Sequence, residues 1–271
     1  MLLSEALILA WATTRSLFIY IFFLSLGTYL FVLYRLYCVL CTPHASKPQN
    51  SSGNCTRSLA VFLGSGGHTS EALTLVSSLD FDKYTPRTYI ISEGDSLSGE
   101  KAVALENLKR PGNSQYRILT MPRVRRVHQS LASTPFTALH SLIWTLRFMT
   151  LPAVLSKRSF ADALLINGPG TCVALVLVTY FNRFWWLESP RIIYVESFAR
   201  VNSLSLSGKL VRPLADRFLV QWANLVQTDG LGLGMPHYQG WCWCYSVSAS
   251  KQECNKLESP HGIQVPFNTL L

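Results

Sequence analysis

Residues 60–69 read AVFLGSGGHT, and this stretch predicts a buried strand, a tight turn and the start of a helix. The turn consists of small residues, which allow a ligand to approach the backbone. The N-terminus of the following helix would offer unpaired N–H groups to an anion such as a diphosphate. A tight turn without a ligand is the alternative. The residues expected to face a ligand here are Gly64, Ser65, Gly66, Gly67 and Thr69.

A second glycine turn follows another apolar strand, at residues 163–166. A third strand, at residues 191–195, is followed by Glu196 and by Ser197, and Ser197 is also expected to contact the substrate. Because the carboxyl ends of parallel strands meet at one edge of a sheet, we expect these turns to converge on one crevice, where open α/β sheets bind ligands. The residues expected to line that crevice from the second turn are Asn167, Gly168, Pro169, Gly170 and Thr171.

The remaining sequence alternates apolar strands with helical patterns. Strands are predicted at residues 58–63, 87–92, 116–120, 163–166, 191–195 and 217–220, and helices at 69–79, 100–108, 134–151 and 172–180. Continuous apolar strands separated by helices are typical of a parallel sheet covered on both faces. We therefore predict an α/β fold with a single Rossmann-like domain.

The first glycine turn departs from two common nucleotide-binding motifs. The third glycine of the dinucleotide motif would fall at Thr69, and Glu93 follows Gly64 at a longer spacing than the usual interval of about 20 residues. The Gly-Lys-Ser/Thr of a Walker loop is also missing. A membrane-tethered, nucleotide-dependent oxidoreductase is therefore kept only as an alternative, and no cofactor is expected.

His68 and Glu196 are the candidate catalytic residues. The positive end of the helix dipole disfavours an imidazolium at His68, so a neutral ring could accept a proton there. A purely structural histidine is the alternative. Glu196 could accept a hydrogen bond from a sugar hydroxyl or act as a base, and an ion pair with Arg200 is the alternative.

The uncharged apolar run from Ser16 to Tyr34 predicts a membrane-spanning helix. At about 1.5 Å per residue it can cross a hydrocarbon core of about 30 Å, and it is longer than the apolar region of a cleaved signal peptide, which is the alternative. Basic residues after the run favour a cytosolic C-terminal domain. The expected division is a flank at 1–15, an anchor at 16–36, a tether at 37–57, the Rossmann-like domain at 58–241 and an atypical tail at 242–271.

The net charge of +9 does not indicate nucleic-acid binding, because basic stripes interleaved with aromatic residues are absent. Arg123, Arg125 and Arg126 form a basic stretch that could hold a pyrophosphate or lipid headgroups, or could simply be solvated. The apolar helix at residues 134–151 is expected in the core, with a helix lying on a membrane as the alternative. The seven scattered cysteines complete no zinc-binding pattern, so no metal site is expected.

Six segments, in order along the chain, carry a resemblance to a known family. They are GSGGHT at 64–69, PRVRRVHQS at 122–130, NGPGTC at 167–172, YVES at 194–197, SLSGKL at 205–210 and FLVQW at 218–222. Over residues 59–225 the chain resembles the membrane-anchoring subunit of the UDP-N-acetylglucosamine transferase of asparagine-linked glycosylation.

The resemblance implies the N-terminal, acceptor-binding half of a split two-domain (GT-B) glycosyltransferase, similar to that half of the bacterial transferase that forms lipid II. A soluble donor-binding subunit would carry most of the UDP-N-acetylglucosamine (UDP-GlcNAc) site. The pair would add a β1,4-linked GlcNAc to N-acetylglucosaminyl-diphosphodolichol on the cytosolic face of the endoplasmic reticulum, and this chain alone would be inactive. The nuclear envelope is a further expected location, and the preceding and following enzymes of the pathway are further expected partners.

The C-terminal end departs from the family. Its members finish soon after a strand of the pattern Tyr-x-Gly-x-Leu-Val, which docks the soluble partner. Tyr238 and Gly240 match that pattern and are expected at the interface, but residues 242–244 interrupt its aliphatic end. The tail beyond is expected to be poorly ordered, whether it reflects a mispredicted exon or a lineage-specific extension. A non-catalytic scaffold that recruits a soluble enzyme to the membrane is the remaining alternative function.

Overall fold

The computed structural model describes residues 2–41, 56–112, 115–125, 129, 133–168, 170–222, 225 and 240–242. The chain divides into two units, Met1–Thr42 and Pro43–Leu271. The first unit is a single helix, α1 (Leu2–Cys41). Within α1, Thr13–Cys41 is long and apolar enough to span a membrane. The predicted anchor, residues 16–36, lies inside this segment, and its boundaries stay a prediction.

The second unit is built on a seven-stranded sheet with the order β3-β2-β1-β4-β5-β6-β7. The strands are β1 (Leu59–Leu63), β2 (Arg87–Ser92), β3 (Tyr116–Met121), β4 (Ala163–Asn167), β5 (Arg191–Val195), β6 (Arg217–Val220) and β7 (Gly240–Cys242). The helices are α2 (Gly67–Ser77), α3 (Ser96–Lys109), α4 (Thr134–Leu155), α5 (Cys172–Phe184), α6 (Leu206–Val211) and the 3₁₀ turn η1 (Arg212–Leu214). All six strand pairs are parallel. This is the strand order of a doubly wound sheet, so the predicted Rossmann-like α/β fold is confirmed.

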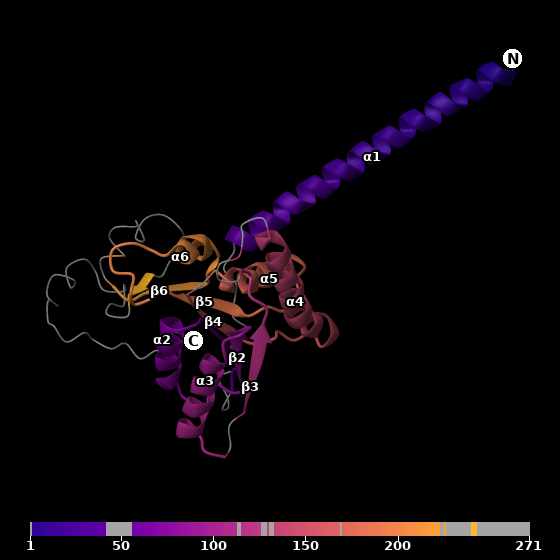
Figure 1. The fold of residues 1–271 in the computed structure, drawn as a ribbon. Helices are drawn as coiled ribbons and strands as arrows, with labels where there is room; N and C mark the ends of the chain where they lie inside the picture. The colour runs from indigo at the N-terminus through magenta and orange to yellow at the C-terminus, as the bar shows by residue number, and fades with distance from the viewer. Residues whose placement is uncertain are drawn as a thin grey trace. The chain divides into compact units, whose positions relative to one another are not determined.

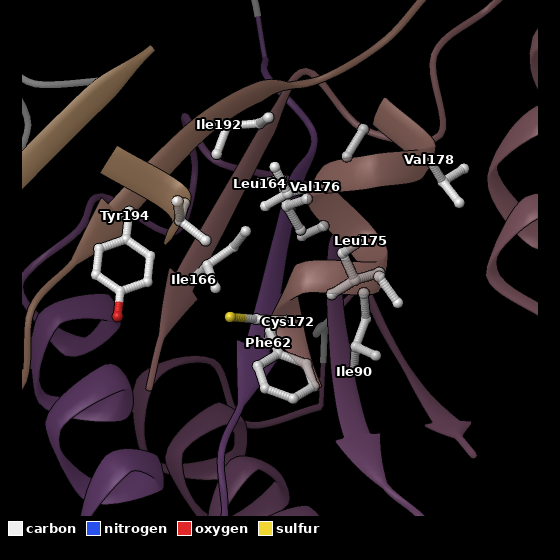
Figure 2. Close-up of a cluster of buried hydrophobic side chains, with 14 of the residues drawn as sticks. Phe62, Ile90, Leu164, Ile166, Cys172, Leu175, Val176, Val178, Ile192 and Tyr194 are labelled. Atoms are coloured by element: carbon white, nitrogen blue, oxygen red, sulfur yellow. The ribbon is translucent and has the colours of Figure 1, made fainter. Parts of the chain in front are cut away.

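Helices cover both faces of the sheet, with α2 and α3 on one side and α4 and α5 on the other (Figure 1). Alternate strand residues supply the two cores: Val61 packs toward α2 and α3, and Phe62 toward α4 and α5. Figure 2 shows the second core, in which Cys172 lies near Phe62. Burial raises the pKa of the Cys172 thiol to about 12, so this cysteine is a core residue and not a reactive thiolate.

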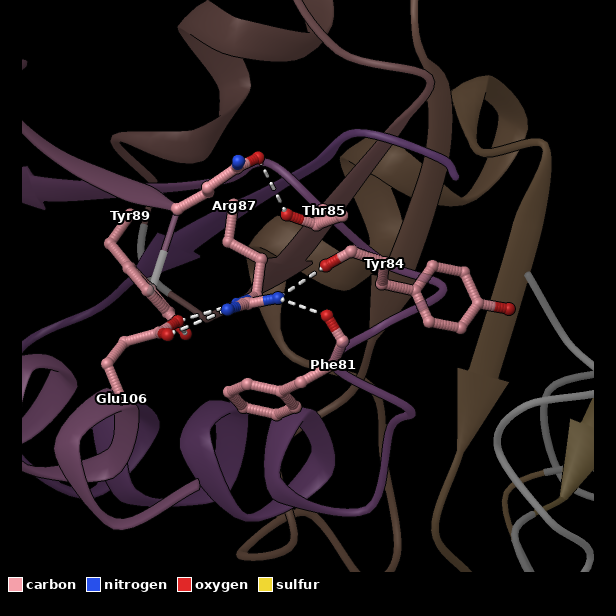
Figure 3. A network of polar contacts seen from close by, with 7 residues as sticks. Phe81, Tyr84, Thr85, Arg87, Tyr89 and Glu106 are labelled. Carbon is pink, nitrogen blue, oxygen red and sulfur yellow. Dashed lines mark hydrogen bonds and ion pairs between the residues drawn. The ribbon is translucent and has the colours of Figure 1, made fainter. Parts of the chain in front are cut away.

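A buried polar network lies at the amino ends of the strands, around Arg87 (Figure 3). The guanidinium donates from Nε and Nη2 to Glu106 of α3 at 2.6 and 2.8 Å, and from Nη1 to the carbonyl oxygens of Phe81 and Tyr84 at 2.9 and 2.7 Å. The hydroxyl of Tyr89 donates to the same carboxylate at 2.7 Å. Burial and the adjacent Glu106 charge raise the pKa of Tyr89, which keeps its proton on the oxygen. The network fastens β2 to α3.

The C-terminal region is described only in part. Gly240 begins β7, whose Cys242 pairs with Val220 of β6. Tyr238 and the predicted tail after Cys242 lie outside the described residues. The role of Tyr238 and Gly240 in docking a partner therefore stays a prediction.

Candidate functional site

The first glycine turn opens onto the carboxyl edge of the sheet, which we define as the ends of β1, β2, β4 and β5 and the loops that follow them. Gly66, with φ of +68°, is the N-cap of α2 and supplies no capping side chain. A Cβ atom at Gly66 or Gly67 would meet nothing within 4 Å, and Ser65 is also exposed. These residues are exposed and no side chain caps α2, so a ligand could reach the N-terminus of this helix, where anions can bind.

Thr69 and Gly64 hold this turn in place from inside. The Thr69 hydroxyl donates to the carbonyl oxygen of Gly64 and lies 2.6 Å from the hydroxyl of Ser98. Both Thr69 and Gly64 are buried. Their predicted contact with a ligand stays a prediction, and their observed contacts are structural.

The second glycine turn meets the first at His68. Gly168 has φ of +100°, a conformation that favours glycine, and a Cβ atom there would lie 2.6 Å from the imidazole ring of His68. Gly170 is exposed and Thr171 is half-buried before α5 begins. Pro169 lies outside the described residues. The absence of a side chain at Gly168 is thus what allows the two turns to touch.

Asn167, the last residue of β4, connects His68 to a carboxylate. Its amide nitrogen donates to Glu71 of α2 at 2.9 Å, and its amide oxygen lies 3.1 Å from Nδ1 of His68. A carboxylate can only accept, so this bond assigns the amide oxygen of Asn167 to His68. Nδ1 must therefore carry the proton of a neutral imidazole, which leaves the lone pair on Nε2.

Glu71 also binds the loop after β5. Its second oxygen accepts hydrogen bonds from the Ser197 hydroxyl at 3.0 Å and from the Phe198 N–H at 3.3 Å. One carboxylate on α2 therefore joins the loops that follow β4 and β5. Sequence reasoning missed Glu71, although its position three residues after His68 places both side chains on one side of the helix.

Glu196 is buried, with 1% of its surface exposed. One carboxylate oxygen accepts from the Ser197 N–H at 3.1 Å, and the other from the N–H and hydroxyl of Ser205, both at 3.1 Å. Among the described residues these contacts replace the ion pair with Arg200 that was the alternative. Glu196 thus holds the loop that leads to α6, where Ser205 caps the helix through the Gly208 N–H.

The basic stretch lies at the end of β3. Nε of Arg123 donates to the carbonyl oxygen of Glu93 at 2.7 Å, which holds Arg123 beside the end of β2. Arg125 is exposed and donates to the carbonyl oxygen of Gln129 at 3.3 Å. Arg126 lies outside the described residues. Arg123 therefore places positive charge beside the end of β2, which belongs to the carboxyl edge.

Comparisons with known proteins identify relatives of this chain. The family model described as "Oligosaccharide biosynthesis protein Alg14 like" matches residues 59–230. A protein from Cryptococcus neoformans named UDP-N-acetylglucosamine transferase subunit ALG14 is 53% identical over 178 residues, which cover 64% of this chain and 77% of that protein. The Mus musculus protein of the same name is 40% identical over 205 residues, covering 73% of this chain and 88% of that protein. No solved structure matches. The extent of the family match shows that this chain belongs to the Alg14-like family of oligosaccharide biosynthesis proteins.

Proposed function

We propose that this chain is the membrane-anchored, acceptor-binding subunit of a two-subunit UDP-GlcNAc transferase. A soluble donor-binding subunit completes the active site, and the pair adds the second GlcNAc, in β1,4 linkage, to N-acetylglucosaminyl-diphosphodolichol on the cytosolic face of the endoplasmic reticulum. The transferase-subunit names of the relatives support this function.

The acceptor's diphosphate is the ligand that suits the first glycine turn. Gly66 and Gly67 are exposed at the positive end of α2, and no side chain caps this helix. Arg123, which donates to the Glu93 carbonyl oxygen after β2, adds positive charge at the same edge of the sheet. A diphosphate bound there would place the acceptor sugar near His68.

His68 is the proposed general base, and its tautomer is the observation that carries the proposal. With Nδ1 donating to Asn167, Nε2 holds the lone pair that can accept a proton. In the reaction, Nε2 removes the proton of the acceptor's 4-hydroxyl while the oxygen forms a bond to the anomeric carbon of the donor. The bond from that carbon to UDP breaks with its electron pair, and the configuration inverts to β.

Glu71 and Glu196 have positioning roles in this proposal. Glu71 orients Asn167, and Asn167 orients the ring of His68. Both oxygens of Glu196 accept hydrogen bonds within the loop at residues 196–205, so this carboxylate fixes the path of that loop. Of the two catalytic candidates from the sequence, the contacts favour His68 as the base.

The test is co-expression of the full chain with a candidate donor-binding subunit, followed by an assay of GlcNAc transfer from UDP-GlcNAc to the diphosphodolichol acceptor. We expect activity from the pair and none from either chain alone. An intact, co-purifying pair without activity would contradict the proposal. A pair in which His68→Ala keeps full activity would instead support the scaffold alternative, because a scaffold needs only to recruit its partner.

A further inference from the structure

Two aromatic side chains, Phe198 and Trp222, lie beside the candidate site and have no role in the proposed reaction. Phe198 is the third residue after β5, and Trp222 is the second residue after β6. The two strands pair in parallel, with Val195 opposite Leu219, so both aromatic residues leave the sheet at the same end. Their ring centroids are 4.8 Å apart and their planes are inclined by 46°. We call these two rings the aromatic pair.

Hydrogen bonds hold the aromatic pair in place. Nε1 of Trp222 donates to the carbonyl oxygen of Phe198 at 2.7 Å, and the N–H of Phe198 donates to the carboxylate of Glu71 at 3.3 Å. Trp222 is also partly buried against the core. The side chain of Phe198 nevertheless keeps 54% of its surface exposed. A single exposed aromatic residue is ordinary, but this one is fixed at both of its backbone polar groups.

The aromatic pair is connected to His68 through a single carboxylate. The Glu71 oxygen that accepts from the Phe198 N–H belongs to the same side chain whose other oxygen accepts from Asn167. Asn167 in turn holds Nδ1 of His68. The fold therefore sets the position of the Phe198 backbone relative to His68. A ring fixed in this way loses little freedom when a ligand covers it, which favours binding.

Polar side chains follow Phe198 in the same loop. Arg200, Asn202 and Ser203 are all exposed, and no carboxylate occurs from Phe198 to Ser203. Their guanidinium, amide and hydroxyl groups can donate hydrogen bonds, and the last two can also accept them. An aromatic surface with a few polar groups at its side is typical of a small-molecule site. Such a surface suits a ligand with an apolar face and a polar rim, and a sugar ring has this form.

We propose that the aromatic pair is a stacking surface for the acceptor's GlcNAc ring, and this inference rests on the proposed function. In GlcNAc the axial C–H bonds at C3 and C5 point to one side of the pyranose, which makes that side apolar. The hydroxyls at C3 and C4 are equatorial and point outward from the rim. Phe198 covers the apolar side, and Trp222 fixes Phe198 through its indole N–H. The 4-hydroxyl then stays uncovered for Nε2 of His68.

The test measures binding of two probes to the full chain in detergent by isothermal titration calorimetry. One probe is a short-chain prenyl diphosphate, and the other is the same compound with GlcNAc on its diphosphate. Phe198→Ala removes the stacking ring, whereas Phe198→Tyr keeps it. Phe136→Ala is the matched control, because Phe136 is a phenylalanine with 76% of its surface exposed on α4.

We expect Phe198→Ala to raise the Kd of the GlcNAc-bearing probe about fivefold, which corresponds to one aromatic contact. The Kd of the sugar-free probe should stay the same, since that probe has no ring to stack. Phe198→Tyr and Phe136→Ala should bind both probes like the wild type. An equal loss for both probes in Phe198→Ala would show that the ring contacts the lipid or supports the fold, and would overturn the proposal. An unchanged Kd for the GlcNAc-bearing probe, or no binding of it by the wild type, would also overturn it.

A second measurement separates a sugar site from a protein-docking site. Phe198→Ala should co-purify with the donor-binding subunit as the wild type does, and in the transfer assay it should raise KM for the acceptor. Loss of co-purification would identify the aromatic pair as a docking surface and overturn the proposal. An active wild-type pair whose acceptor KM is unchanged by Phe198→Ala would overturn only the stacking surface. An inactive wild-type pair would contradict the proposed function, whatever the binding of the two probes.

Discussion

Two carboxylates, the buried Glu106 and the half-buried Glu71, organise polar networks at opposite ends of the sheet, and they do so differently. Glu106 receives the guanidinium of Arg87 and the hydroxyl of Tyr89, so its network is closed and inaccessible to water. Glu71 instead leads through Asn167 to His68, which is half-buried. Among the described residues, Nε2 of His68 has no hydrogen-bond partner. The closed network stabilises the fold, and the open one leaves a group able to react.

The closed network should dominate stability. Arg87→Met leaves Glu106 buried without its cation, so we expect the free energy of unfolding to fall by about 3–5 kcal/mol. Denaturant unfolding of the full chain in detergent, followed by tryptophan fluorescence, measures this. The double variant Arg87→Met/Glu106→Met should recover most of the loss, because no lone charge remains. A loss below about 1 kcal/mol for the single variant would show that the charge is solvated.

The open network should dominate activity. His68→Ala is expected to lower the transfer rate of the complex about 100-fold, the typical contribution of a general base, with little effect on unfolding. Steady-state assays with purified pairs measure this, and Glu100→Ala on the exposed side of α3 is a control expected to act like the wild type. If His68→Ala lowered the free energy of unfolding as much as Arg87→Met, the loss of activity would reflect a damaged fold, and His68 would be a structural residue.

The carboxylate of Glu71 should act through orientation. Glu71→Ala removes the hydrogen-bond acceptor of the Asn167 amide. We expect kcat to fall about tenfold, which corresponds to the net free energy of about one hydrogen bond, while KM changes little. Glu71→Gln can still accept from Asn167 and should restore most of kcat. Equal losses for Ala and Gln would indicate that the charge itself, and not the hydrogen bond, is needed.

The proton on Nδ1 gives a test by pH. Asn167→Asp places a carboxylate against the imidazole where the amide oxygen now lies, and this negative charge favours the imidazolium form of the ring. Because the base must be unprotonated, the acidic limb of the profile of kcat/KM against pH should move to higher pH, by on the order of one unit. Asn167→Ala lacks the added charge and should not show this displacement. If the acidic limb of the kcat/KM profile of Asn167→Asp lay at the same pH as in the wild type, His68 would be excluded as the general base.

The sequence predicted the framework well, because apolar strands that are buried on both faces have a clear pattern. The predicted ranges for β2, β5 and β6 agree with the structure. The contacts within the site could not be read in the same way. Glu71 resembles any exposed helical glutamate until Asn167, nearly a hundred residues later in the chain, is placed beside it. Likewise, the burial of Glu196 depends on Ser205 and Gly208, which reach it only through the path of the intervening loop.

The outer side of α4 shows a different limit of sequence reasoning. Its composition allowed both a core helix and a helix on a membrane, and the structure buries Ser141, Thr145, Met149 and Ala153 while it leaves large apolar residues such as Phe136 and Leu155 exposed. Composition averages over both sides. Only the rotation set by Thr137, Ser141 and Thr150 separates them.

The contact between Gly168 and His68 also constrains how the family can vary. Since the imidazole occupies the space that any side chain at 168 would need, neither position can change alone without displacing the other. Sequences that drift away from glycine at 168 should therefore carry a smaller residue at 68, and with it lose the capacity to transfer protons. Relatives with substitutions at both positions are therefore expected to keep the fold but to lack a proton-accepting group at position 68.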